Sequence, residues 1–145
     1  MQKQRNQHHQ RIETIEKSEF ENFYSKEELN EFLEYVKEDL ELNSYTYFRL
    51  LAYSGDRKSE LLALKWSDID FDTSTLNINK TLTKGLNNKI IVQPTKTVNG
   101  RRVIDMDNYS MKLLKQWKMH QAQFMLKLGY NTNRPDQHVF CEYEK

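Results

Sequence analysis

Apolar residues recur at three- and four-residue spacing from Leu29 onward, and acidic residues occupy the other positions. Ser25 and Glu28 have the spacing of a capping box, in which the serine oxygen accepts a backbone N–H and the glutamate reaches back to the helix start. The pattern predicts an amphipathic surface helix over 26–39. Residues 1–22 lack apolar periodicity and are rich in polar side chains, which predicts a flexible tail or interdomain linker.

Residues 45–54 leave little polar face, so a second helix is predicted there and should be buried. Asn43 or Ser44 can cap its start, and Gly55 is expected to end it. A short third helix is predicted over about 58–65.

The apolar period then changes to two, which is typical of strands. We expect three strands, over 76–80, 89–93 and 102–106, separated by turn clusters and paired as a small antiparallel meander. Because helices and strands do not alternate, the predicted fold class is α+β, mainly helical with a small three-stranded antiparallel sheet.

A long helix is predicted over about 109–128, capped by Asp107 or Asn108 and ended by Gly129. Its apolar positions define the face that should be buried. The residues expected on that face are Leu113, Trp117, His120, Phe124 and Leu128.

Composition narrows the class of protein. The 145 residues are 37% hydrophobic and 30% charged, which allows one lean domain. A polar N-terminus without an apolar run of about 18 residues predicts a cytoplasmic protein that does not enter a membrane. Cys141 is the only cysteine, which excludes an internal disulfide framework.

The net charge of +1 hides a split along the chain. Residues 11–41 carry 11 acidic and 4 basic side chains, whereas residues 42–145 carry 16 basic and 10 acidic ones. Two interpretations stay open. The acidic part is a surface helix on an ordinary domain, or the basic part meets an anionic partner such as nucleic acid.

Metal chemistry has little support in the sequence. There is no His-Glu-x-x-His motif and no glycine-rich phosphate loop. Asp68, Asp70 and Asp72 have the spacing of calcium ligands but lack the glycine and glutamate of a calcium loop, so we expect them to cap turns. His8 and His9 are an adjacent pair in a polar tail, where solvated side chains are the expectation.

Two basic residues are candidates for phosphate chemistry. Arg57 lies in the connection before the short helix, where a guanidinium beside free backbone N–H groups suits phosphate binding. The alternative is a structural ion pair with Glu60. Lys96 is expected at the tight end of a β-hairpin, from which a lysine can reach a bound ligand; the alternative is an ordinary exposed turn lysine.

Residues 53–71, which read YSGDRKSELLALKWSDIDF, resemble the opening of the catalytic domain of phage-integrase-type tyrosine recombinases. The similarity continues through 76–78, 94–97 and 101–104 and covers about 24–141 in order. It is strongest to integrases of conjugative mobile elements and prophages. The resemblance therefore implies a role in DNA integration and DNA recombination.

In this family a tyrosine hydroxyl attacks a DNA phosphate and forms a 3′-phosphotyrosyl bond, without a metal or cofactor. The resemblance implies that residues 23–145 are the N-terminal part of that catalytic domain. Arg57 matches the first catalytic arginine, which clamps the scissile phosphate, and Lys96 matches the lysine that protonates the departing 5′ hydroxyl. Glu60 matches the acidic residue that braces the site. The further DNA-binding residues that we predict are Lys58, Lys84, Arg101 and Arg102.

The family's His-x-x-Arg helix and late nucleophilic tyrosine are not recognisable. His120 and His138 are not followed by arginine three residues later, and Tyr143 comes too early. We therefore expect a fragment that does not cleave DNA alone but binds the phosphates of double-stranded DNA, with other recombinase protomers as partners. The alternative is a truncated remnant that acts as a DNA-binding or recombinase-pairing regulatory module. A third alternative is an α+β domain whose arginine and lysine are structural.

Overall fold

The computed structural model of the protein describes residues 24–131 and 134–140. Chain contacts divide the protein into two units, residues 1–31 and 32–145. The tail predicted over 1–22 lies outside the described residues. The single residues discussed above that also lie outside them are His8, His9, Cys141 and Tyr143.

Helix α2 spans Lys26–Asp39, as predicted. The backbone N–H of Ser25 donates to Glu28 Oε2 at 2.7 Å, and the N–H of Glu28 donates to Ser25 Oγ at 3.1 Å. These reciprocal bonds confirm the capping box. In the second unit, Leu33 and Val36 are the buried residues of the helix, one turn apart on its apolar stripe.

Helix α3 spans Leu42–Ser54 and begins earlier than predicted. Its N-cap residue is Glu41, so the predicted cap at Asn43 or Ser44 is wrong. Leu42 packs against the hydrophobic core, and this tertiary contact extends the helix beyond the polar residues that would otherwise cap it. Gly55 ends the helix in the left-handed conformation (φ 68°), as predicted.

Helix α4 spans Lys58–Leu62 and is shorter than the predicted 58–65. The chain beyond it pairs with the last described segment instead of continuing the helix. The N–H of Val139 donates to the carbonyl of Leu64 at 2.9 Å, and the N–H of Trp66 donates to that of Gln137 at 3.0 Å. This pairing is a long-range contact that local spacing does not encode.

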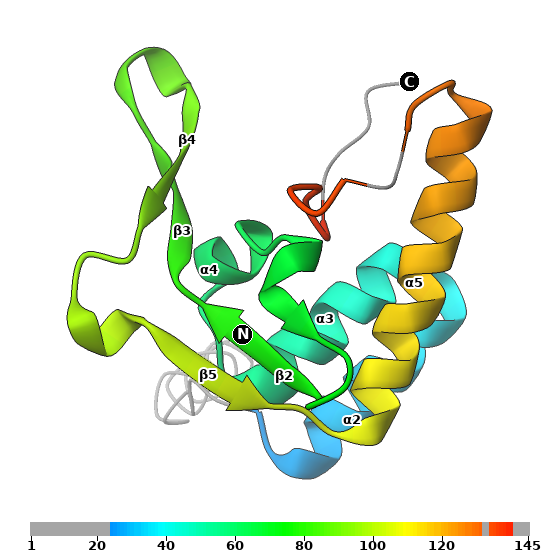
Figure 1. The fold of residues 1–145 in the computed structure, drawn as a ribbon. Helices are drawn as coiled ribbons and strands as arrows, with labels where there is room; N and C mark the ends of the chain where they lie inside the picture. The colour runs from blue at the N-terminus through cyan, green and yellow to red at the C-terminus, as the bar shows by residue number, and fades with distance from the viewer. Residues whose placement is uncertain (1–23, 132–133, 141–145) are drawn as a thin grey trace, which may run out of the picture. The chain divides into compact units, whose positions relative to one another are not determined.

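In the part of the chain that the structure describes, five strands form two antiparallel sheets (Figure 1). The first sheet has the order β1-β2-β5, with β1 at Ile69–Asp70, β2 at Thr75–Ile78 and β5 at Arg102–Asp105. The second consists of β3 at Lys80–Lys84 and β4 at Ile90–Pro94. In Figure 1 the β3–β4 hairpin extends beyond the sheet that contains β2 and β5.

The α+β class is confirmed, but the predicted meander is wrong. The segment predicted as the middle strand, β4, pairs with β3 from Lys80–Pro94 to Lys84–Ile90, and β2 pairs directly with β5. Every residue of β4 is exposed, whereas Leu76 and Ile78 of β2 are buried. A period of two identifies strands without identifying their partners, which is why the sequence did not distinguish the two arrangements.

Helix α5 spans Asn108–Lys127 and is capped by Asp107, whose Oδ1 accepts the N–H of Ser110 at 3.0 Å. Leu113 and Trp117 are buried as predicted. The remainder of the predicted buried face is wrong, because His120, Phe124 and Leu128 are exposed. The buried positions on the helix are Ser110, Met111, Leu113, Leu114, Trp117, Gln121 and Met125.

Buried Gln121 explains the difference in face. Its Oε1 accepts Trp66 Nε1–H at 2.6 Å, and its Nε2 donates to the carbonyls of His138 and Val139 at 3.1 and 3.2 Å. Because a polar residue occupies one of the core-facing positions of α5, the pattern of apolar residues alone does not identify that face as buried.

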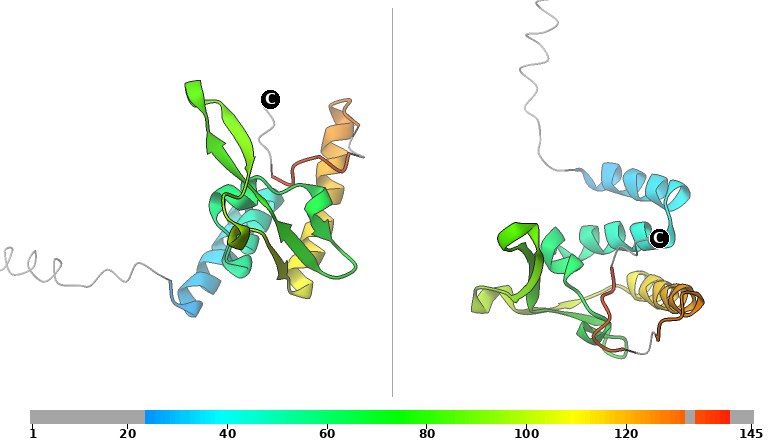
Figure 2. Two further views of the ribbon diagram at one scale, coloured as in Figure 1. Left: turned by 60° about the vertical axis from the view of Figure 1, so that its left-hand side comes forward. Right: turned by 90° about the horizontal axis from the view of Figure 1, so that it is seen from above.

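Helices α3 and α5 lie next to each other (Figure 2). Arg49 of α3 bonds to the start of α5. Its Nη2 donates to Asp107 Oδ1 at 3.3 Å and its Nε donates to Ser110 Oγ at 3.2 Å. The guanidinium carbon lies 3.6 Å from the centre of the Tyr53 ring, a cation–π contact.

The core of the second unit lies between α3, α4, β2 and α5 and includes the last described segment. Its largest fully buried apolar side chains are Leu50, Leu61, Leu64, Leu76, Ile78, Leu114 and Val139. Among the described helices, none has the length and apolar character needed to cross a membrane.

Candidate nucleic-acid interface

The candidate site begins at the turn between α3 and α4, where Arg57 is the residue that precedes α4. Its backbone is extended (φ −77°, ψ 146°) and its side chain is exposed. Within residues 24–131 and 134–140, its guanidinium makes no hydrogen bond and no ion pair. Helix α4 has only five residues, so the expected contribution of its N-terminus to phosphate binding is not supported by the structure. The side chain itself is what can contact an anion.

The ion pair between Arg57 and Glu60 that was the alternative interpretation is absent from the described residues. Glu60 Oε2 instead accepts the backbone N–H of Arg57 at 3.0 Å. Glu60 is therefore bonded to the main chain of the turn and leaves the arginine side chain unengaged.

Arg102, at the start of β5, is the cation that pairs with Glu60. Its Nη2 lies 2.6 Å from Asp56 Oδ1 and 2.9 Å from Glu60 Oε2, and its Nη1 lies 3.3 Å from Glu60 Oε1. Nη1 also donates to the carbonyl of Gly100 at 3.4 Å. A planar guanidinium suits two carboxylates in this way because its donors form a fixed fork.

The two acidic side chains have opposite pKa shifts. Hydrogen bonds from Arg102 lower the pKa of Glu60, despite its burial. Burial raises the pKa of Asp56, and its Oδ2 is buried without a hydrogen-bond partner in the described structure. The hydrogen bond to Glu60 raises the pKa of Arg102. The cluster holds two carboxylates and one guanidinium.

Lys96 does not lie at a hairpin tip, so that part of the prediction is wrong. The tip of the β3–β4 hairpin is formed by residues 85–89, where the N–H of Gly85 donates to the carbonyl of Lys89 at 2.8 Å. Lys96 lies two residues beyond β4, in the loop that leads to β5, and its side chain is exposed. The tight turn forms at the earlier glycine and asparagine cluster, which puts Lys84 next to the tip instead.

A surface groove of about 440 Å³ lies between α4 and the β3–β4 hairpin. It brings together three of the predicted phosphate ligands, Arg57, Lys58 and Lys84. Lys96 and Arg101 are not among the residues that line it. The full lining is Arg57, Lys58, Ser59, Leu62, Leu82, Thr83, Lys84 and Ile90.

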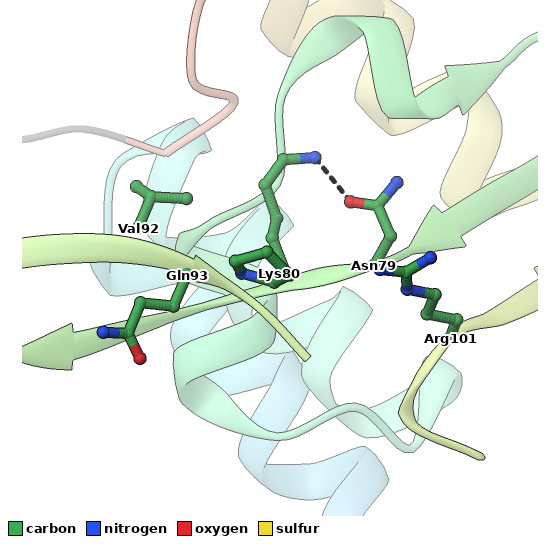
Figure 3. A pocket seen from close by; sticks show the side chains of 6 residues that line it. Asn79, Lys80, Val92, Gln93 and Arg101 are labelled. Carbon is green, nitrogen blue, oxygen red and sulfur yellow. Dashed lines mark hydrogen bonds between the residues drawn. The ribbon is translucent and has the colours of Figure 1, made fainter. Parts of the chain in front are cut away.

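A second pocket of about 410 Å³ contains Arg101 and Lys80 (Figure 3). Lys80 Nζ donates to Asn79 Oδ1 at 2.8 Å and lies 2.5 Å from Asp68 Oδ2. Lys80 was not among the predicted site residues. Its place at an otherwise apolar position of a period-two pattern was the available signal, because a lysine there requires a partner.

Asp68 and Asp70 cap turns, as expected. Asp68 Oδ2 accepts the N–H of Lys65 at 2.8 Å, and Asp70 Oδ1 accepts the N–H groups of Asp72 and Thr73 at 2.9 and 3.1 Å. The bond from Thr73 is the main reason that the pKa of Asp70 is lowered. Among the described side chains, no group of three or more His, Cys, Asp or Glu is arranged to hold a metal ion.

Comparison with known proteins identifies the family. Residues 22–144 match the sequence model of the phage integrase family. The chain belongs to this family. It is 30% identical over 118 residues to the ICEBs1 integrase of Bacillus subtilis (strain 168), which covers 81% of this chain and 31% of that protein. It is 33% identical over 109 residues to a tyrosine recombinase XerC-like protein of Caldanaerobacter subterraneus subsp. tengcongensis, which covers 69% and 28%.

Two solved structures have a similar fold over part of their length. One is a variant of the Tn1549 transposon integrase in complex with transposon right end DNA, with a TM-score of 0.63 and 21% identity over 72% of this chain and 34% of that one. Another is XerA recombinase, with a TM-score of 0.53 and 24% identity over 83% of this chain and 35% of that one. The chain thus spans about a third of the length of these relatives.

Proposed function

We propose that the protein is the N-terminal part of the catalytic domain of a cytoplasmic DNA integrase from a mobile element, and that it binds the phosphates of double-stranded DNA. The observation that carries this proposal is the difference between the surroundings of Arg102 and Arg57. Arg102 is held by buried carboxylates, whereas the Arg57 guanidinium is exposed in a groove with Lys58 and Lys84. Such a cluster of cations suits a phosphate backbone.

The proposed reaction is that of a full-length integrase. A tyrosine hydroxyl attacks the scissile phosphate, and negative charge develops on the phosphate oxygens. Arg57 stabilises that charge. As the bond from phosphorus to the 5′ oxygen breaks, Lys96 donates a proton to that oxygen, which leaves as a hydroxyl, and the proton released by the tyrosine balances the one that Lys96 gives up. Glu60 braces the turn that carries Arg57, through the 3.0 Å bond to its N–H. The chain of 145 residues alone binds DNA without cleaving it.

Within this proposal, Lys58, Lys84 and Arg101 contribute further contacts with DNA phosphates. Arg102 was predicted as another, but its two ion pairs favour a bracing role. DNA binding measured as a function of salt tests the proposal. We expect affinity that falls steeply with salt and that weakens in Arg57→Ala, and unchanged binding in that variant would contradict it.

A second function, association with a full-length recombinase, has its own supporting observation. A groove of about 770 Å³ has mainly apolar lining side chains from α3, α4, the hairpin and α5, together with Asn43, Ser44, Lys58 and His138, and it extends to Phe140, the last described residue. The hydroxyl of Tyr47, in its lining, is buried without a partner in the described structure. Because the chain spans a third of its relatives, the occupant that we propose is polypeptide of a full-length family member.

A further inference from the structure

Arg102 is bonded to two segments that carry the proposed site residues. On one side it reaches Asp56 and Glu60, which flank Arg57 in the turn before α4. On the other side it donates to the carbonyl of Gly100, in the loop that carries Lys96. No other side chain in the described ranges forms hydrogen bonds to both segments.

The loop that carries Lys96, residues 95–101, is compact. A bond that fixes one end of the loop therefore also restricts the position of Lys96. The N–H of Gly100 donates to the carbonyl of Thr97 at 3.0 Å, and the N–H of Thr95 donates to the carbonyl of Asn79 at 3.1 Å. A Cβ atom added to Gly100 would lie 2.8 Å from Thr95 Cβ, which leaves no room for a side chain.

We propose that Arg102 is a positioning residue that fixes the Arg57 turn relative to the Lys96 loop, with Asp56 as a second anchor. The inference rests on the proposed function, in which the side chains of Arg57 and Lys96 must act at the same phosphate group. In the described structure, the side chains of Arg57 and Lys96 form no hydrogen bond or ion pair that would fix them. The distance between the two cations therefore depends on the backbone segments that Arg102 connects. Proximity and orientation of this kind are a large part of catalytic efficiency.

The geometry explains why an arginine is required. Asp56 and Glu60 are buried, with side chains 0% and 5% exposed, while that of Arg102 is 33% exposed. A lysine carries the same charge but cannot present two parallel N–H donors to two carboxylates and a third bond to a carbonyl. Arg102→Lys therefore keeps the charge and removes the connection.

A double-mutant cycle tests the proposal on the whole chain. The affinity for a duplex DNA is measured for the wild type, Arg57→Ala, Arg102→Lys and the double variant, with thermal unfolding of each. We expect Arg102→Lys to weaken binding about fivefold in the wild-type background and to have no further effect beside Arg57→Ala, because contacting or coupled residues are not additive.

The outcomes separate the inference from the proposed function. Equal losses in both backgrounds mean that Arg102 contacts DNA directly, which overturns the inference and leaves the proposed function standing. No loss in Arg102→Lys also overturns the inference. No loss in Arg57→Ala contradicts the proposed function itself. If Arg102→Lys does not fold at the assay temperature, Asp56→Asn, which removes one of the two ion pairs and keeps Arg102 and the size of the side chain, takes its place in the cycle.

Discussion

Glu60 accepts the backbone N–H of Arg57 at 3.0 Å and leaves the guanidinium of the same residue unbound. The acidic residue thus fixes where the turn lies without neutralising the cation that the turn presents. A buried carboxylate three residues from an exposed arginine is compatible with anion binding only because a second arginine, Arg102, satisfies that carboxylate.

Arg57→Ala is expected to weaken DNA binding and to make it less sensitive to salt. Loss of one phosphate contact should make the slope of log affinity against log salt shallower by about 0.9. Fluorescence anisotropy with a labelled duplex over a range of salt measures both. Lys127→Ala is the matched control, because Lys127 is exposed near the end of α5 and does not line the groove. Equal slopes for the two variants would count against a phosphate contact at Arg57.

Glu60→Ala is expected to lower the free energy of unfolding by about 3 kcal/mol, the scale for removing one partner of a buried ion pair. The change leaves Arg102 with one carboxylate and leaves the N–H of Arg57 without its acceptor. Urea unfolding of the wild type and of Glu60→Ala measures this change in the free energy of unfolding. Glu34→Ala, which removes an exposed pair with Lys37, should cost less than about 0.5 kcal/mol. Similar losses in both variants would mean that the buried cluster adds no particular stability.

Acid should destabilise Asp56→Asn more steeply than the wild type. The folded pKa of Glu60 is below 4.5, so its stabilising effect is present above pH 4.5 and is lost as pH falls through the folded pKa. The folded pKa of Asp56 is above 3.8, so the folded state takes up its proton first and gains stability as pH falls towards 3.8. Without Asp56 that gain is lost. Urea midpoints from pH 7 downward measure the difference, and parallel curves would contradict it.

Gly55→Ala and Gly100→Ala should both destabilise the protein, for different reasons. Gly55 has φ of 68° with open space around its Cβ position, so the cost is backbone strain alone, about 1 kcal/mol. At Gly100 the added Cβ would lie 2.8 Å from Thr95 Cβ, so the loop must move. We expect the second variant to alter DNA affinity more than the first, because the loop that must move carries Lys96. Thermal unfolding and DNA binding of both variants provide the comparison.

The protein is expected to associate with a full-length family member through the apolar groove. Ile90→Asp introduces a charge into the groove lining and should abolish capture of the chain in a pull-down. Because Ile90 also lines the phosphate groove, the pull-down is done after nuclease treatment, without DNA. Val98→Asp is the control, because Val98 is also an exposed β-branched apolar residue but lies outside the groove. A chain that stays monomeric and ignores the full-length protein would exclude this function.

Local signals predicted most of the helices and their ends. The capping box at Ser25, the glycine stop at Gly55 and the aspartate cap at Asp107 depend on neighbours a few residues away, so the sequence contains all that is needed. The motif around Arg57 was recognisable for the same reason, because the turn and the short helix are contiguous.

The features that the sequence did not reveal depend on distant partners. Glu60 lies three residues after Arg57, a spacing that suggests an ion pair between them, but its ion-pair partner is Arg102, 42 residues away. Gln121 is polar by composition and buried through bonds to Trp66 and to the last described segment. The pairing of β4 with β3 is likewise a choice among strands with similar patterns. In each case a contact between residues far apart in the sequence, and not the local pattern, determined the structure.

The pairing of the segment after α4 with residues 137–139 has a consequence for how the chain folds. Leu64 and Trp66 are bonded to Val139 and Gln137, more than 70 residues later, and Val139 is fully buried. Contacts of such sequence separation slow folding, because a long loop must close before they form. During synthesis on the ribosome, the core around Leu64 stays incomplete until Val139 has emerged, so the helices made earlier cannot complete their packing before that point.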